Sequence, residues 1–195
     1  MNNSSIRIGV LGDLGVGKAE LVHRLCHPDS AGPAPTASLA GPTVDVLDYA
    51  RRDGRGHVWV EFIVIPGETR HPRSRQMVYS IGLDALFLVC NGAAHRTLLR
   101  AAEWMEEAAG VGQLRGAPVA LVLGGPVSAD WAASTALTQA IEPLVATYRA
   151  QVLDLSGYTS GQVPDPRQRV HMHDFFELVL RHKESMEQGA SASMR

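Results

Sequence analysis

Residues 12–19 read GDLGVGKA and combine glycines with a lysine at a spacing suited to binding an anion. Gly12, Gly17 and Lys18 fit the pattern G-x-x-x-x-G-K, known as the P-loop. Glycines let the backbone curl until several N–H groups point at one anion, and the lysine adds a charge that reaches the outer phosphates. This glycine-rich loop therefore predicts a phosphate cradle built from Gly12, Asp13, Leu14, Gly15, Val16, Gly17, Lys18 and Ala19.

The last position of the loop departs from the pattern. A Ser or Thr normally follows the lysine, and its hydroxyl binds Mg²⁺. Here the position is Ala19, which has no oxygen to offer. A glycine-rich turn without a ligand is the simpler alternative, but an apolar strand before the loop and an amphipathic helix after it supply the context that the motif requires.

The surrounding elements alternate between strand and helix patterns. Strands are expected over 6–11, 43–49, 57–65, 84–90, 118–123 and 151–155, and helices over 18–27, 76–81, 95–109, 129–148 and 174–186. Asp53-Gly54 predicts a hairpin between the second and third strands, and Asp174 with Glu177 resembles a capping box opening the last helix. We expect an α/β fold: a six-stranded, mainly parallel sheet with one antiparallel hairpin strand and helices on both faces.

Composition bounds the class of protein. With 195 residues the chain is most simply one domain, which we place at 6–187 between flexible ends at 1–5 and 188–195. The net charge of −2 argues against a nucleic-acid-binding protein. No signal peptide, membrane span or lipidation motif is recognisable, and Cys26 and Cys90 are most simply reduced thiols. We therefore expect a cytoplasmic protein without a membrane anchor of its own.

The order of elements and three stretches resemble the small GTPases of the Ras and Rab superfamily. The stretches are GDLGVGKAELVH at 12–23, GPTVDV at 41–46, and PGETR with VYSIGLDALFLV between 66 and 89. Within that superfamily they look most like the Rab-like subfamily that includes the third Rab-like protein of animals and the plant light-insensitive-period GTPase. The resemblance implies a P-loop NTPase with a Ras-like fold and GTP or GDP as ligand.

The chain departs from this family at several functional positions. Leu39 stands where the effector loop carries a threonine, and Val64 stands where D-x-x-G carries the aspartate that holds Mg²⁺ through water. The guanine-reading N-K-x-D is replaced by Gly124-Gly-Pro-Val127. The resemblance places any remaining base contacts at Gly124, Gly125, Ser156 and Gly157, where the family has N-K-x-D and S-A-K. It therefore predicts weak GTP or GDP binding, and no protein side chain on Mg²⁺.

These losses favour a binding protein over an enzyme. The expected function is that of a pseudo-GTPase that scaffolds partners in intracellular transport, ciliary or signalling complexes. The alternative is a GTP-binding switch with weak GTPase activity, in which Glu68 would orient the attacking water. A P-loop kinase or ATPase is a third interpretation, which the hairpin after the first helix disfavours.

Two further clusters are candidate sites. Arg70, Arg73 and Arg75 could bind a protein partner or form a solvated loop, and the resemblance makes the 29–42 and 66–75 loops the partner-binding surface. His171 and His173 lack the spacing and third ligand of a metal site, so we expect no metal there and a polar lead-in to the last helix. Protein partners would bring the chain to cilia or vesicles.

Overall fold

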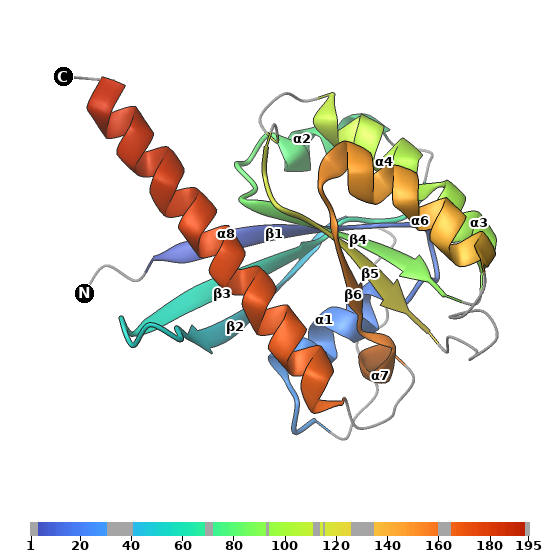
Figure 1. Ribbon diagram of the computed structural model, residues 1–195, viewed down its shortest axis with the longest axis horizontal. Helices are drawn as coiled ribbons and strands as arrows, with labels where there is room; N and C mark the ends of the chain where they lie inside the picture. The colour runs from blue at the N-terminus through green and yellow to red at the C-terminus, as the bar shows by residue number, and fades with distance from the viewer. Residues whose placement is uncertain are drawn as a thin grey trace.

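The computed structural model describes residues 4–30, 41–68, 72–92, 94–110, 114, 116–125, 135–159 and 165–193. Within them six strands form one sheet in the order β2-β3-β1-β4-β5-β6 (Figure 1). The strands are β1 (Ser5–Leu11), β2 (Thr43–Ala50), β3 (His57–Val64), β4 (Ala85–Asn91), β5 (Val119–Gly124) and β6 (Gln151–Asp154). β2 pairs antiparallel with β3 and the other neighbours pair in parallel, which confirms the predicted sheet.

Helices cover both faces of the sheet. They are α1 (Lys18–Cys26), α2 (Pro72–Tyr79), α3 (His95–Leu99), α4 (Ala101–Ala109), α6 (Thr135–Tyr148), α7 (Ser156–Thr159) and α8 (Pro166–Ser193). One hydrophobic core joins the sheet to α1 and α8, and a second joins the opposite face to α2, α3, α4 and α6. The central strands β4 and β5 are apolar along almost their whole length because both of their faces are buried.

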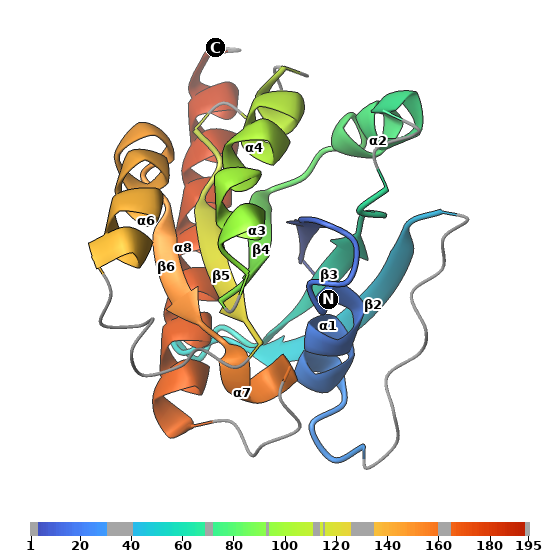
Figure 2. The same ribbon diagram turned by 90° about the vertical axis from the view of Figure 1, so that its right-hand side faces the viewer.

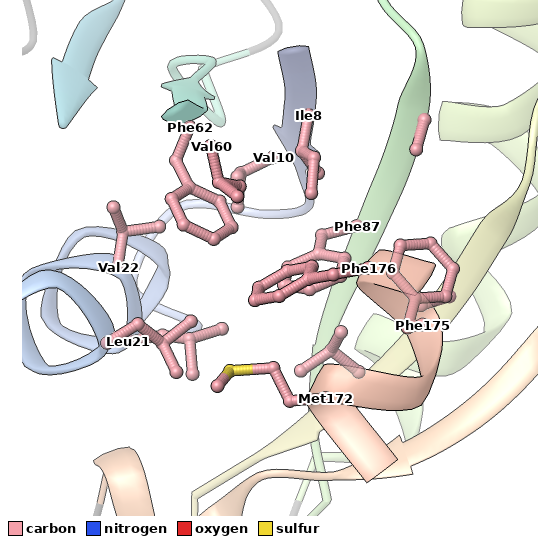
Figure 3. Packing of buried hydrophobic residues seen from close by; sticks show 14 of the residues in the cluster. Ile8, Val10, Leu21, Val22, Val60, Phe62, Phe87, Met172, Phe175 and Phe176 are labelled. Carbon is pink, nitrogen blue, oxygen red and sulfur yellow. The ribbon is translucent and has the colours of Figure 1, made fainter. Parts of the chain in front are cut away.

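Aromatic side chains fill the first core. Phe62 on β3 and Phe87 on β4 meet Phe175 and Phe176 on α8, with ring centroids 5.3 to 6.0 Å apart (Figure 3). Leu21 approaches the same cluster from α1. This core fixes α1, and with it the glycine-rich loop between β1 and α1, against the sheet.

The prediction for the last helix was wrong at both ends. α8 begins at Pro166, where the Asp165 carboxylate accepts a hydrogen bond from the Arg167 N–H at 2.7 Å. Asp165 therefore caps the helix and proline takes its first position, whereas the apparent capping box at Asp174 lies in the helix interior. The expected tail from residue 188 continues as helix to Ser193 and extends beyond the sheet (Figure 1), because Gly189 lowers helix stability by only about 1 kcal/mol.

Other element boundaries differ less. α2 starts four residues before the expected 76, so it includes part of the 66–75 segment that we predicted to be a loop. The helix expected over 95–109 is divided at Arg100 into α3 and α4, and 156–159 forms the short helix α7. The predictions for Arg70, Leu39, Val127 and most of the 29–42 loop fall outside the described residues.

Candidate functional site

The glycine-rich loop has the backbone shape expected of an anion cradle. Gly12, Gly15 and Gly17 all have positive φ, at 138°, 79° and 87°. A Cβ on Gly12 would lie 2.2 Å from the Val89 carbonyl oxygen of β4, so only glycine fits there. The loop leads directly into α1, whose N-terminal end attracts negative charge. The glycine conformations and the position of the loop before α1 agree with the predicted cradle, and phosphate binding stays a prediction.

Lys18 binds the loop itself. Its ammonium donates hydrogen bonds of 2.7 Å to the carbonyl oxygens of Gly12 and Asp13. The residue is only 7% exposed, and burial lowers the pKa of Lys18 to about 8, an effect that the nearby Asp13 carboxylate partly opposes. Lys18 thus holds the curled backbone together, and the same charge lies beside the cradle that would receive a phosphate.

The Asp13 carboxylate is directed away from Lys18 toward α4. It accepts a hydrogen bond of 2.9 Å from the Trp104 indole N–H and lies 3.2 Å from an Arg100 guanidinium nitrogen. Because Arg100 balances its charge, the carboxylate opposes an anion in the loop less than a free one would. Sequence reasoning missed the roles of Arg100 and Trp104, which are 87 and 91 residues away from Asp13.

Residues after β3 close one side of the loop. A Cβ on Gly67 would lie 2.4 Å from the Asp13 carbonyl carbon and the Leu14 nitrogen, so the two backbones are in direct contact. Glu68 follows immediately, and its carbonyl oxygen accepts a hydrogen bond from Arg75. Glu68 is thus next to a residue that touches the loop, and its catalytic role stays a prediction.

The two positions at which the resemblance places metal ligands carry no side-chain oxygen. Val64 ends β3 as a buried core residue, and Ala19 is the second residue of α1. Among the described residues no group of three or more His, Cys, Asp or Glu side chains is placed to hold a metal ion. Ala19 and Val64 therefore supply no side-chain oxygen to Mg²⁺, and the predictions about phosphate and Mg²⁺ binding stay predictions.

The residues predicted to contact a base come together around Thr159. The Thr159 hydroxyl accepts a hydrogen bond of 2.6 Å from the Gly125 N–H and donates one of 3.2 Å to the Ser156 carbonyl oxygen. Its methyl group would lie 3.3 to 3.4 Å from a Cβ on Gly17 or Gly124. α7 thus lies beside α1 and β5 (Figure 2). The described residues 124 and 125 carry no side-chain carboxylate to read a guanine edge, and no local sequence signal marked Thr159.

Of the three candidate partner-binding arginines, the structure describes Arg73 and Arg75, which differ in exposure. Arg73 is exposed on α2. Arg75 is only 5% exposed. Its guanidinium donates two hydrogen bonds to Glu107, and these bonds are the main cause of its raised pKa. Arg75 is therefore not a solvated loop residue, because its charge is paired with Glu107 inside the protein. Arg70 is outside the described residues.

Comparisons with known proteins identify no family. No protein-family model and no curated protein matches the chain. None of the helices in the described part of the chain is long and apolar enough to span a membrane.

Proposed function

We propose that this chain is a small-GTPase-like protein of the Ras and Rab type that has kept the phosphate cradle and lost the magnesium and guanine contacts. In this proposal it is a pseudo-GTPase that binds protein partners in transport, ciliary or signalling complexes. The observation that carries the proposal is a contrast: the loop at Gly12–Lys18 has the glycine conformations expected of a phosphate cradle, while the side chains of Ala19 and Val64 supply no metal ligand.

The arrangement of the sheet supports the proposed family. β1 leads into the glycine-rich loop, α1 follows, and the next strand forms an antiparallel hairpin at the edge of the sheet. This is the order of elements expected of a Ras-like P-loop NTPase. The carboxyl ends of β1, β3 and β5 bring residues 12–19, 67–68 and 124–125 to one rim, where ligands bind in such sheets.

The missing metal ligands argue against efficient hydrolysis. A bound metal contributes several kcal/mol to phosphoryl transfer by neutralising charge that develops on the phosphates. A loss of about 4 kcal/mol corresponds to a rate reduction of about a thousandfold. We therefore propose that the chain meets its partners through the 29–42 and 66–75 segments without a GTPase cycle, in the cytoplasm or at the structures to which its partners are attached.

A GTP-binding switch with weak GTPase activity is the second candidate. It is favoured by the ion pair between Asp13 and Arg100, because a balanced carboxylate opposes a bound GTP or GDP less than a free one would. In this alternative Lys18 would contact the phosphates, and Glu68 would orient the attacking water. Nucleotide binding would then require ligands for Mg²⁺ other than side chains at positions 19 and 64.

The nucleotide content of the purified protein separates the two candidates. The protein is purified in Mg²⁺ without added nucleotide and denatured, and the released nucleotide is quantified by ion-exchange chromatography. We expect far less than one nucleotide per chain. Near-stoichiometric GDP or GTP that is lost in Lys18→Ala but kept in the exposed control Arg73→Ala would overturn the pseudo-GTPase proposal. Melting with added GTP, with and without Mg²⁺, detects weak binding lost during purification.

A further inference from the structure

The helix α2 presents two chemically different faces. Arg75, Val78 and Tyr79 are buried against the body of the domain. Residues Arg73, Gln76, Met77 and Ser80 are exposed at the helical spacing that defines the opposite face. Met77 is 72% exposed. A buried arginine on the inner face is unusual, because a guanidinium can leave water only when it is paired.

Every nitrogen of the Arg75 guanidinium has a partner. Nε and Nη2 donate hydrogen bonds of 2.7 Å to the two carboxylate oxygens of Glu107 on α4, and Nη1 donates to the Glu68 carbonyl oxygen. The guanidinium carbon also lies 5.1 Å from the centre of the Trp104 ring. This bidentate geometry fixes the position of the helix more tightly than a single contact would.

The surrounding residues reinforce the same contact. The Tyr79 hydroxyl, on a fully buried residue of α2, donates a 3.1 Å hydrogen bond to Glu107. Trp104 donates its indole N–H to Asp13, so the cluster also reaches the glycine-rich loop. All of these groups belong to the chain itself, and none of the contacts needs a phosphate or a metal ion.

We propose that Arg75 and Glu107 form a latch that holds α2 on α4 in one position, whatever occupies the glycine-rich loop. The inference rests on the proposed function, in which α2 belongs to the surface that meets protein partners. It deepens that function because the outer face of α2 is then presented permanently, rather than only in one ligand state. The protein would bind its partners constitutively.

Hydrogen–deuterium exchange at the backbone N–H groups of residues 76–80 tests the latch. These groups donate the hydrogen bonds of α2 and its last turn. In the wild type we expect their exchange rates to change less than about twofold on adding GDP with Mg²⁺ or inorganic phosphate. Glu107→Gln leaves the Arg75 charge without its partner and should raise these rates about tenfold or more. Glu106→Gln, which removes an exposed carboxylate from the same helix, should leave the rates unchanged.

Two further variants keep the test interpretable. Arg75→Lys retains the charge but not the bidentate contact, and it should also speed exchange in α2 if Glu107→Gln does not fold. Trp104→Phe removes the hydrogen bond to Asp13 but keeps an aromatic ring beside Arg75, and it should speed exchange in the glycine-rich loop more than in α2. The latch is overturned if nucleotide shifts α2 exchange about tenfold, or if Arg75→Lys and Glu107→Gln leave it unchanged.

The outcome for the latch is distinguishable from that for the proposed function. A protein that purifies with nucleotide and still shows nucleotide-insensitive α2 exchange refutes the pseudo-GTPase and keeps the latch. A protein that purifies empty, with α2 exchange unaffected by Glu107→Gln, keeps the pseudo-GTPase and refutes the latch. Both measurements use the full chain.

Discussion

Lys18 carries a charge into a site that is almost closed to water. In the folded protein burial lowers the pKa of its ammonium from 10.5 to about 8. Between these two values the unfolded chain holds a proton that the folded chain has released. By linkage, the contribution of Lys18 to the free energy of unfolding must therefore rise with pH across this interval.

A comparison of the wild type with Lys18→Met isolates this contribution. We expect the unfolding free energy of the wild type, relative to that of the variant, to rise by about 3 kcal/mol from pH 7.5 to pH 10.5. Urea unfolding at several pH values measures it. Because both proteins keep the buried Cys90 and Tyr79, whose pKa values are raised, the titration of these groups cancels in the difference. A difference independent of pH would show that Lys18 titrates normally.

Thr159 illustrates a different role for a single hydroxyl. Thr159→Val keeps the shape of the side chain but leaves the Gly125 N–H without its 2.6 Å acceptor, so we expect a loss of about 1 to 3 kcal/mol in unfolding free energy. Thr159→Ser keeps the hydroxyl and loses only the methyl group, which lies next to Gly17 and Gly124, and this loss should cost about 0.8 kcal/mol. Chemical denaturation of both variants provides the test, and equal losses would refute the bridging role.

At the scale of elements, the start of α8 depends on one carboxylate. Asp165→Ala removes the hydrogen bond to the Arg167 N–H and should lower stability by about 1 kcal/mol. Asp174→Ala is the matched control: this aspartate lies on the exposed surface of the helix and pairs with Arg52, so its loss should cost about 0.5 kcal/mol or less. A larger cost for Asp174→Ala would mean that the helix depends on the apparent capping box after all.

The same elements show what could be predicted from the sequence. The continuous apolar run of β4 and the Asp-Gly turn between β2 and β3 are local signals, and they gave the six strands and the hairpin. The start of α8 was missed because Asp174 and Glu177, at the start of the expected helix, match the pattern of a capping box.

The candidate site was predictable only where its residues are adjacent in sequence. The glycine-rich loop is a continuous motif, so its conformation followed from the pattern of glycines. The contacts of Thr159 with Gly125 and of Arg75 with Glu107 join residues 34 and 32 positions apart. Such partners depend on which elements the sheet brings together, and the sequence alone carries no local sign of them.

For the whole molecule, stability resides in the two cores on either side of the sheet. Phe175 and Phe176 of α8 are completely buried in the first core. By contrast, residues 185–191 of the same helix are exposed and extend beyond the sheet (Figure 1). One helix thus contains a segment that contributes strongly to folding and a segment with little apolar contact.

Shortening α8 separates these two segments. Ending the chain after Gln188 should change the free energy of unfolding by less than about 0.5 kcal/mol, because the removed residues that the structure describes are exposed. Phe176→Ala in the same helix should cost about 3 to 5 kcal/mol, since it leaves a cavity among packed aromatic rings. Urea denaturation of both proteins tests the contrast. A loss of about 2 kcal/mol on truncation would place part of the folding energy in the terminal turns, and it would require them to pack against the domain.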